Sequence, residues 1–179
     1  MDTGLELDVS YLLRNMHDLF VGPFTKGWAM AEIERIDVQL KTGAHSDAGT
    51  DGEVFLFIGG REFRINQKLP HNDRERGKTD NLILGKDSNI EDSDNNDPRK
   101  APLTFENITK FPVWLRFEPK PKAKPNEPDD DWNLDFAVVK VSAKADASGV
   151  AAEKTYKVLT TGSDSIWLGR SKGLFVYLL

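Results

Sequence analysis

The chain has 179 residues and a net charge of −5, with 39% hydrophobic and 30% charged residues. This size and balance fit one soluble domain with a sizeable core, or one domain with an appendage. The negative charge argues against broad, unspecific nucleic-acid binding. The absence of cysteine excludes a disulfide framework and thiolate chemistry.

The sequence has no basic segment followed by an apolar segment at its start, as a secretory signal would require. No apolar run approaches the roughly 20 residues that a membrane-spanning helix needs. We therefore expect a cytoplasmic protein whose contact with a membrane, if it makes one, is peripheral.

Residues 1–30 form the first predicted unit, a helix followed by a short arm. Six apolar residues lie at helical spacing on one face: Val9, Leu12, Leu13, Met16, Leu19 and Phe20. Asp8 is a candidate N-cap, and Gly22 and Pro23 end the pattern. The helix either packs across one end of a β-domain or offers a contact surface to a partner or a second copy of the chain. Trp28 is the tryptophan expected to be exposed, and so a possible lipid or partner contact.

Residues 33–65 predict three strands. Ile36, Val38 and Leu40 alternate with polar residues, which is typical of a strand with one buried face. Residues 53–58 are nearly all apolar and favour β-structure. Gly59 and Gly60 then predict a tight hairpin into residues 61–65.

The rest of the chain predicts further short strands separated by polar loops. The strands are expected near residues 81–84, 111–117, 132–141, 155–160, 166–169 and 174–178. This makes about eight or nine strands with no helix between them, which indicates an antiparallel sandwich or barrel. Trp114, Trp132 and Trp167 lie at strand positions and are expected in the core.

An acidic insertion at residues 85–101 interrupts this series. Asp92, Asp94 and Asn96 are spaced like the start of an EF-hand calcium loop. The sixth position is Asp97 rather than glycine, and no glutamate stands at the twelfth. The expected structure is therefore a solvated, mobile excursion, with a calcium loop as the alternative.

Four motifs in order give the chain from about residue 33 to about residue 170 a resemblance to the PLAT or LH2 domain. This β-sandwich accompanies catalytic domains in lipoxygenases and lipases and forms the C-terminal half of clostridial alpha-toxin. The motifs are Thr42–Gly43 with Ala48–Gly49–Thr50–Asp51, Glu75–Arg76–Gly77 with Asp80, Asp130–Asp131–Trp132 with Leu134, and Tyr156–Lys157–Val158 with Ile166–Trp167–Leu168.

The resemblance implies an all-β fold for residues 31–179, an eight-stranded antiparallel sandwich of two four-stranded sheets. It also implies a non-catalytic role in docking to a lipid surface or a partner protein, often with calcium in the loops at one end.

By resemblance, the main calcium site joins Asp47 and Gly49 to Asp131 and the carbonyl of Trp132. Calcium takes six to eight oxygen ligands, and the crowded carboxylates of residues 129–131 repel one another unless a cation lies among them. The alternative is a pair of solvated loops whose Asp and Gly residues serve turn geometry. Possible additional metal ligands are Thr50, Asp51, Asn72, Asp73 and Asp130. Lys68 and Leu69 stand where further ligands would be expected, which argues against a second complete site.

Lys120, Lys122 and Lys124 lie in the loop before the predicted calcium ligands. They either meet anionic lipid head groups, where each basic residue adds about 1 kcal/mol, or keep the loop soluble.

No nucleophile, metal-binding histidine pair or glycine-rich phosphate loop is recognisable, so we expect no enzyme. The function predicted is calcium-assisted binding to a lipid or membrane surface. The alternative is a protein-interaction or oligomerisation module that uses residues 1–30 and is independent of calcium.

Overall fold

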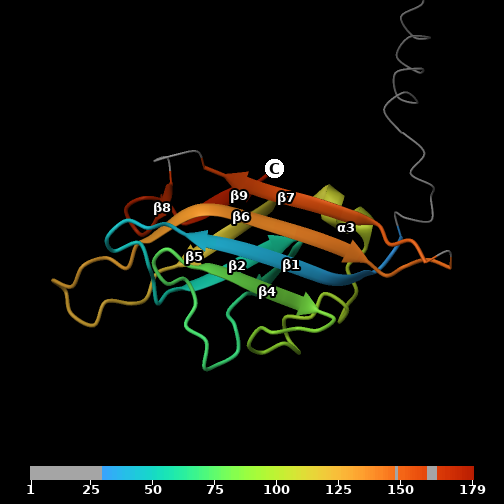
Figure 1. Cartoon of the computed structure of the whole chain (residues 1–179), viewed down its shortest axis with the longest axis horizontal. Helices are drawn as coiled ribbons and strands as arrows, with labels where there is room; N and C mark the ends of the chain where they lie inside the picture. The colour runs from blue at the N-terminus through green and yellow to red at the C-terminus, as the bar shows by residue number, and fades with distance from the viewer. Residues whose placement is uncertain (1–29, 148, 161–164) are drawn as a thin grey trace, which may run out of the picture.

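The computed structural model describes residues 30–147, 149–160 and 165–179. They form two antiparallel β-sheets packed face to face, with their loops at the two ends (Figure 1). The predicted helix and arm of residues 1–30, with Trp28, lie outside the described residues apart from Met30, whose side chain is exposed.

The first sheet has five strands: β1 (Ile33–Thr42), β4 (Thr79–Gly85), β6 (Trp132–Ala143), β7 (Glu153–Leu159) and β8 (Ile166–Leu168). Their order is β4-β1-β6-β7, and β8 pairs with the beginning of β6. The predicted alternation in β1 is confirmed, because Ile36, Val38 and Leu40 are buried and face the second sheet.

The second sheet has four strands: β2 (Glu53–Ile58), β3 (Arg61–Arg64), β5 (Val113–Glu118) and β9 (Phe175–Leu178). Their order is β3-β2-β5-β9. The predicted hairpin at Gly59 and Gly60 is present, and both glycines have positive φ (62° and 82°), a conformation that other residues adopt rarely.

The described residues thus contain nine strands, rather than the eight in two four-stranded sheets that the family resemblance implied. The additional strand is β8 in the first sheet. Its three residues pair with Trp132, Asn133 and Leu134 beyond the point where β7 has separated from β6.

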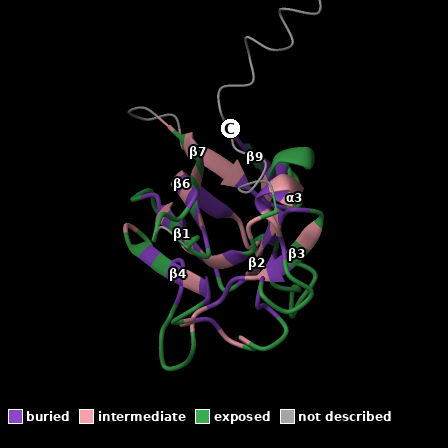
Figure 2. Cartoon of the chain, turned by 90° about the vertical axis from the view of Figure 1, so that its right-hand side faces the viewer, coloured by how far each residue is buried: buried purple, intermediate pink, exposed green. Residues whose placement is uncertain are grey.

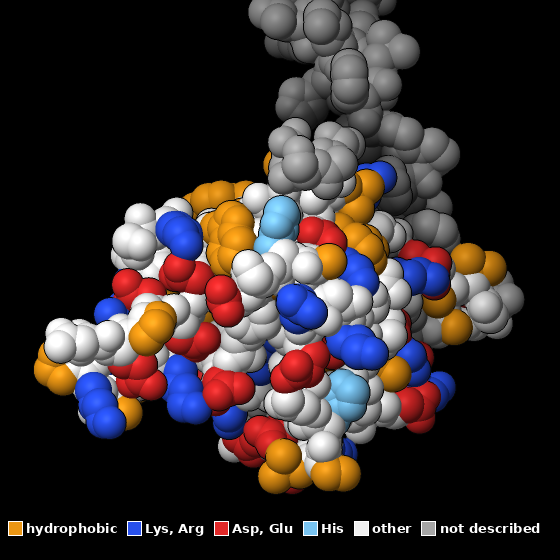
Figure 3. All heavy atoms as spheres, turned by 60° about the vertical axis from the view of Figure 1, so that its left-hand side comes forward, with side chains coloured by type: hydrophobic (Ala, Val, Ile, Leu, Met, Phe, Trp, Pro, Cys, Tyr) orange, Lys and Arg blue, Asp and Glu red, His pale blue; other side chains and the backbone are white. Residues whose placement is uncertain are grey.

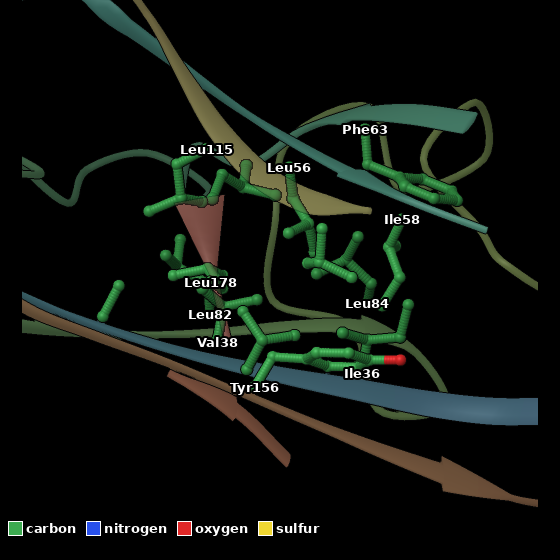
Figure 4. Packing of buried hydrophobic residues seen from close by; sticks show 14 of the residues in the cluster. Ile36, Val38, Leu56, Ile58, Phe63, Leu82, Leu84, Leu115, Tyr156 and Leu178 are labelled. Carbon is green, nitrogen blue, oxygen red and sulfur yellow. The ribbon is translucent and has the colours of Figure 1, made fainter. Parts of the chain in front are cut away.

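The core lies between the sheets, as the buried residues in Figure 2 show. Inward-facing residues of the two sheets interdigitate, among them Val38, Leu82 and Leu84 from one and Leu56, Ile58 and Leu115 from the other (Figure 4). Tyr156 reaches in from β7, and its hydroxyl donates a 2.6 Å hydrogen bond to the carbonyl of Ile108. This bond ties the first sheet to α3.

The acidic insertion is packed against the sandwich, so the expectation of a solvated, mobile excursion is wrong. Ile90 is fully buried and lies in the core cluster. The Asn96 side chain accepts a 2.8 Å bond from the amide of Arg64 at the end of β3. The acids do not converge as an EF-hand loop requires, because Asp94 pairs with Lys100 and Asp97 with Arg99.

A short helix, α3 (Phe105–Lys110), follows the insertion and was not predicted. Its N-cap is Thr104, which forms a capping box with Asn107. Phe105 and Ile108 bury their side chains and close the end of the sandwich opposite the predicted calcium loops (Figure 1). None of the helices in the described part of the chain is long and apolar enough to cross a membrane.

Candidate metal and lipid-binding site

The loops that carry the predicted calcium ligands gather at one end of the sandwich (Figure 1). Loop 43–52, between β1 and β2, is fixed to the start of β6. The amide of Gly43 donates to the carbonyl of Asn133 (2.8 Å), and the amide of Asn133 donates to the carbonyl of Ala48 (3.0 Å). Loop 119–131 leads into the same strand. Topology thereby brings together acids that are about eighty positions apart.

These two loops, with the turn after β8, line an open cleft of about 650 Å³. We call it the acidic cleft. Four carboxylates and one ammonium group line it, together with Gly49: Asp47, Asp129, Asp130, Asp131 and Lys172. Figure 3 shows this end of the molecule, where acidic and basic side chains are interspersed over the surface. The excess of carboxylates favours a cation in the cleft.

Asp131 has the most constrained carboxylate of the cleft, with a side chain 17% exposed. Its Oδ2 accepts a bond from the ammonium of Lys172, whereas its Oδ1 is buried and lacks a hydrogen-bond partner among the described residues. A Cβ at position 169 would lie 1.8 Å from this Oδ1, so a side chain there would displace the Asp131 carboxylate. An unpaired buried carboxylate oxygen is costly, and a bound cation relieves that cost.

Asp130 connects the two loops instead of pointing a free carboxylate into the cleft. Its Oδ1 accepts from the hydroxyl of Thr50 (2.7 Å), and its Oδ2 accepts from the amide of Lys120 (2.7 Å). The Thr50 hydroxyl also accepts from the amide of Gly52. Thr50 and Asp130 thus hold the shape of the cleft.

Of the other predicted main-site residues, Asp47 and Gly49 line the cleft, whereas Trp132 does not. Asp47 is exposed and has a positive φ of 59°, which suits the left-handed turn of the loop. Trp132 is completely buried, and its indole N–H donates to the hydroxyl of Thr42 (3.0 Å). Its ring therefore anchors the start of β6, directly after Asp131, within the core.

Two of the three predicted lipid-contact lysines form ion pairs at this end of the molecule. Lys120 lies 2.8 Å from Asp51, and Lys122 lies 3.1 Å from Asp129. The side-chain bond to Asp51 raises the pKa of Lys120. Lys124 is exposed in the same loop. The lysines thus neutralise part of the acidic charge that surrounds the cleft.

The second group of predicted ligands lines a different hollow, of about 240 Å³, next to the acidic cleft. Thr50, Asp51, Asn72 and Asp73 all border it. Arg64 and Arg74 border it too, so its charge favours a cation less than that of the acidic cleft does. The side-chain amide of Asn72 donates to the carboxylate of Glu75.

Within the described ranges, one group of three side chains brings possible metal-ligating atoms within 4.8 Å of one another. It consists of His71, Asp73 and Asp80. The sequence analysis named Asp73 as a possible metal ligand but gave Asp80 only as part of a family motif, and it did not name His71 as a ligand. Among the described residues, no three carboxylates of the acidic cleft come as close together as this group.

Of the three tryptophans that were expected in the core, only one is buried there. Trp132 is in the core, whereas Trp114 and Trp167 are partly exposed. Trp114 stacks on Phe57 with a centroid separation of 3.8 Å on the outer face of the second sheet, where Phe175 and Tyr177 approach its edge.

The arrangement defines an antiparallel β-sandwich with an acidic cleft between its loops at one end. Among solved structures, the fold is similar to that of the alpha-toxin from Clostridium absonum, with a TM-score of 0.50 and 20% sequence identity. That match covers 94% of this chain and 37% of the toxin. A Clostridium perfringens alpha-toxin from an avian strain gives a TM-score of 0.41 and 21% identity, over 83% of this chain and 36% of the toxin.

The chain therefore spans little more than a third of the toxins that it matches. No protein-family model matches the sequence, and neither does any curated protein. The likeness to the Clostridium absonum toxin establishes the sandwich fold, and the PLAT or LH2 assignment remains a resemblance based on the sequence motifs.

Proposed function

We propose that the chain is a non-catalytic module that binds a lipid surface with the help of calcium held in the acidic cleft. The observation that carries this proposal is the Asp131 carboxylate. Its Oδ1 is buried without a hydrogen-bond partner among the described residues, in a cleft lined by four carboxylates and one lysine. The fold shared with the Clostridium absonum alpha-toxin supports the same class of module.

Asp47, Asp131 and the backbone oxygens of Gly49 and Trp132 are the ligands that we assign to calcium. Calcium accepts carboxylate, carbonyl and water oxygens in flexible geometry, and an open cleft leaves room for water or a phosphate oxygen. The bound ion supplies positive charge that neutralises the acids and attracts an anionic head group.

Neutralising the acids also changes the partners of the lysines. Lys122 pairs with Asp129 in the cleft wall, and Lys172 pairs with Asp131. A dication bound by Asp131 next to Asp129 weakens both ion pairs, so the two ammonium groups become available to lipid phosphates. Lys120 and Lys124 lie in the same loop as Lys122 and extend this basic surface. Calcium binding thereby strengthens the attraction between this end of the chain and an anionic lipid surface.

A calcium titration of the unfolding temperature tests the metal part of the proposal. The wild type should show a saturable rise after chelator treatment, because a ligand that binds only the folded state stabilises it by about 2.7 kcal/mol at a hundredfold excess over Kd. The variant Asp47→Asn/Asp131→Asn should lose the rise. A wild-type protein without a calcium response would contradict the proposal.

The alternative is a protein-interaction module independent of calcium. Its predicted surface, residues 1–30, lies outside the described residues apart from Met30, but a second surface also supports it. Phe175 and Tyr177 on β9 are 53% and 59% exposed and flank the stacked Trp114 and Phe57. Aromatic side chains exposed together on one sheet face are common at protein interfaces. Sedimentation in chelator tests this alternative. An oligomer that is lost in Phe175→Ser/Tyr177→Ser would favour it, and a monomer with calcium-dependent lipid binding would count against it.

A further inference from the structure

Loop 65–78 between β3 and β4 contains a second arrangement of ligating groups, distinct from the acidic cleft. His71 lies in the loop, Asp73 follows it by two residues, and Asp80 is the second residue of β4. The Nε2 atom of His71 is 3.6 Å from Asp73 Oδ1 and 3.5 Å from Asp80 Oδ1. One imidazole nitrogen therefore faces one oxygen of each carboxylate.

The other oxygen of each carboxylate is held by the backbone. Asp73 Oδ2 accepts from the amide of Gln67 (2.6 Å), and Asp80 Oδ2 accepts from the amide of Arg74 (2.8 Å). These bonds fix both carboxyl groups in orientations that turn their Oδ1 atoms toward His71. Such supporting hydrogen bonds are typical of metal ligands in proteins.

Asp73 provides a second, independent observation that this group binds an ion. Its side chain is 6% exposed, and its Oδ1 has no hydrogen-bond partner among the described residues. Arg74 does not fill this role, because its Nη1 faces Asp73 Oδ2 at 3.6 Å. Two carboxylates against one buried guanidinium leave a net negative charge beside the imidazole.

We propose that His71, Asp73 and Asp80 bind a divalent transition cation of the Zn²⁺ class. A zinc ion about 2.1 Å from two tetrahedral ligands holds them about 3.4 Å apart, close to the two distances from His71. Imidazole nitrogen suits zinc and its neighbours in the first transition row, whereas calcium takes oxygen ligands. His71 is 48% exposed, so the ion has a path from solvent and room for water as a further ligand.

The position of the group indicates what the metal does. Loop 65–78 supports loop 43–52 of the acidic cleft: the amide of Gly77 donates to the carbonyl of Gly43, and the amide of Thr50 donates to the carbonyl of Arg74. The same loop presents Leu69, whose side chain is 80% exposed. A metal bound by His71, Asp73 and Asp80 links this loop to β4 and so stabilises its position, independently of any ion in the acidic cleft.

Zinc titration of the full chain by calorimetry, after chelator treatment and with millimolar Ca²⁺ present, tests the proposal. We expect one equivalent of Zn²⁺ to bind and His71→Gln to weaken its affinity by more than about tenfold, the effect expected when even a supporting residue is lost. The half-exposed position of His71 lets this variant fold, which its unfolding temperature in chelator checks. His45→Gln is the matched control and should keep wild-type affinity, since His45 lies in loop 43–52.

A second variant separates this site from the proposed calcium site. Asp47→Asn/Asp131→Asn should keep the zinc affinity while it loses the calcium response. Failure of the wild type to bind Zn²⁺ would overturn the zinc proposal and leave the calcium proposal standing. Equal zinc affinity in His71→Gln and the wild type would overturn it too, as would an equal loss in His45→Gln.

Discussion

Lys172 controls the calcium affinity of the acidic cleft if Asp131 is a calcium ligand. The Lys172 ammonium holds Asp131 Oδ2, and a cation–π contact with Trp167 at 4.7 Å helps to keep it there. An incoming calcium ion must displace this ammonium or bind beside it. We therefore expect Lys172→Gln to bind calcium more tightly than the wild type.

The size of the effect follows from these two cases. Calcium lies about 2.3–2.6 Å from a ligating oxygen, so an ammonium on the other carboxylate oxygen is about 5 Å from the ion. At that distance a dication and a single positive charge repel by about 1.7 kcal/mol in water, and physiological salt reduces this to about 1 kcal/mol. Because Lys172 is 41% exposed, water-like screening applies.

If calcium instead displaces the ammonium, breaking the Lys172–Asp131 ion pair costs about 0–1 kcal/mol. Either case raises the cost of calcium binding in the wild type by about 1 kcal/mol, which corresponds to a roughly fivefold lower calcium Kd in Lys172→Gln. Calorimetric calcium titration of both proteins measures this difference.

Lys140→Gln is the matched control. Lys140 is 47% exposed and paired with Glu153 at 2.8 Å, so its removal changes the net charge equally and breaks a comparable pair. It lies eight residues along β6 from Trp132, roughly 26 Å from the cleft at 3.3 Å per residue. Its calcium Kd should stay within about twofold of the wild type. An unchanged or higher Kd in Lys172→Gln would refute the assignment of Asp131 as a calcium ligand.

Three further predictions concern the same structure. Gly169→Ala should abolish the calcium-induced rise in unfolding temperature, because the added methyl group displaces the Asp131 carboxylate; a wild-type rise would show that this carboxylate is not needed. Tyr156→Phe should lower the unfolding free energy by about 1–1.5 kcal/mol and the unfolding temperature by about 2–6 °C. Burial raises the pKa of Tyr156 from 10.0 to about 12. Wild-type stability should therefore fall as the pH rises from 10.0 toward 12 in urea titrations, and Tyr156→Phe should lack this part of the fall. Arg116 lowers the pKa of Glu62 below its ordinary 4.5, so acid below that pH should destabilise the wild type more than Arg116→Gln. Equal acid sensitivity would mean that this ion pair is not formed in solution.

The strands were predictable wherever apolar and polar residues alternate. Ile36, Val38 and Leu40 identified the buried face of β1 because side chains along a strand point to opposite faces. The same rule places Trp114 outside, since Val113, Leu115 and Phe117 face inward. We expected it in the core on residue type alone, and the period of the strand was the better guide.

Two elements escaped prediction for physical reasons. The six residues of α3 are too few to show helical periodicity, although Thr104 and Asn107 form a capping box that could have indicated its start. The acidic insertion looked solvated because charge dominates its composition. Ile90 and Pro98 are nevertheless buried and fix it to the sandwich, and neighbouring acids pair with Lys100 and Arg99.

The candidate sites were predictable only in part. The resemblance named Asp47 and Asp131, which line one cleft, but it gave no indication of Lys172, forty-one residues beyond Asp131. Periodicity and local motifs do not report which loops the topology places at the same end of a sandwich. For the same reason, the convergence of His71 and Asp80 on Asp73 became visible only in three dimensions.

Calcium-dependent sedimentation with phospholipid vesicles tests the central claim most directly. The full chain is mixed with vesicles of neutral lipid alone, or with anionic phospholipid added, in calcium or in chelator. We predict sedimentation with anionic vesicles in calcium, release by chelator, and no sedimentation of Asp47→Asn/Asp131→Asn under the same conditions. A wild-type chain that stays in the supernatant with every lipid composition in saturating calcium would contradict the proposed function.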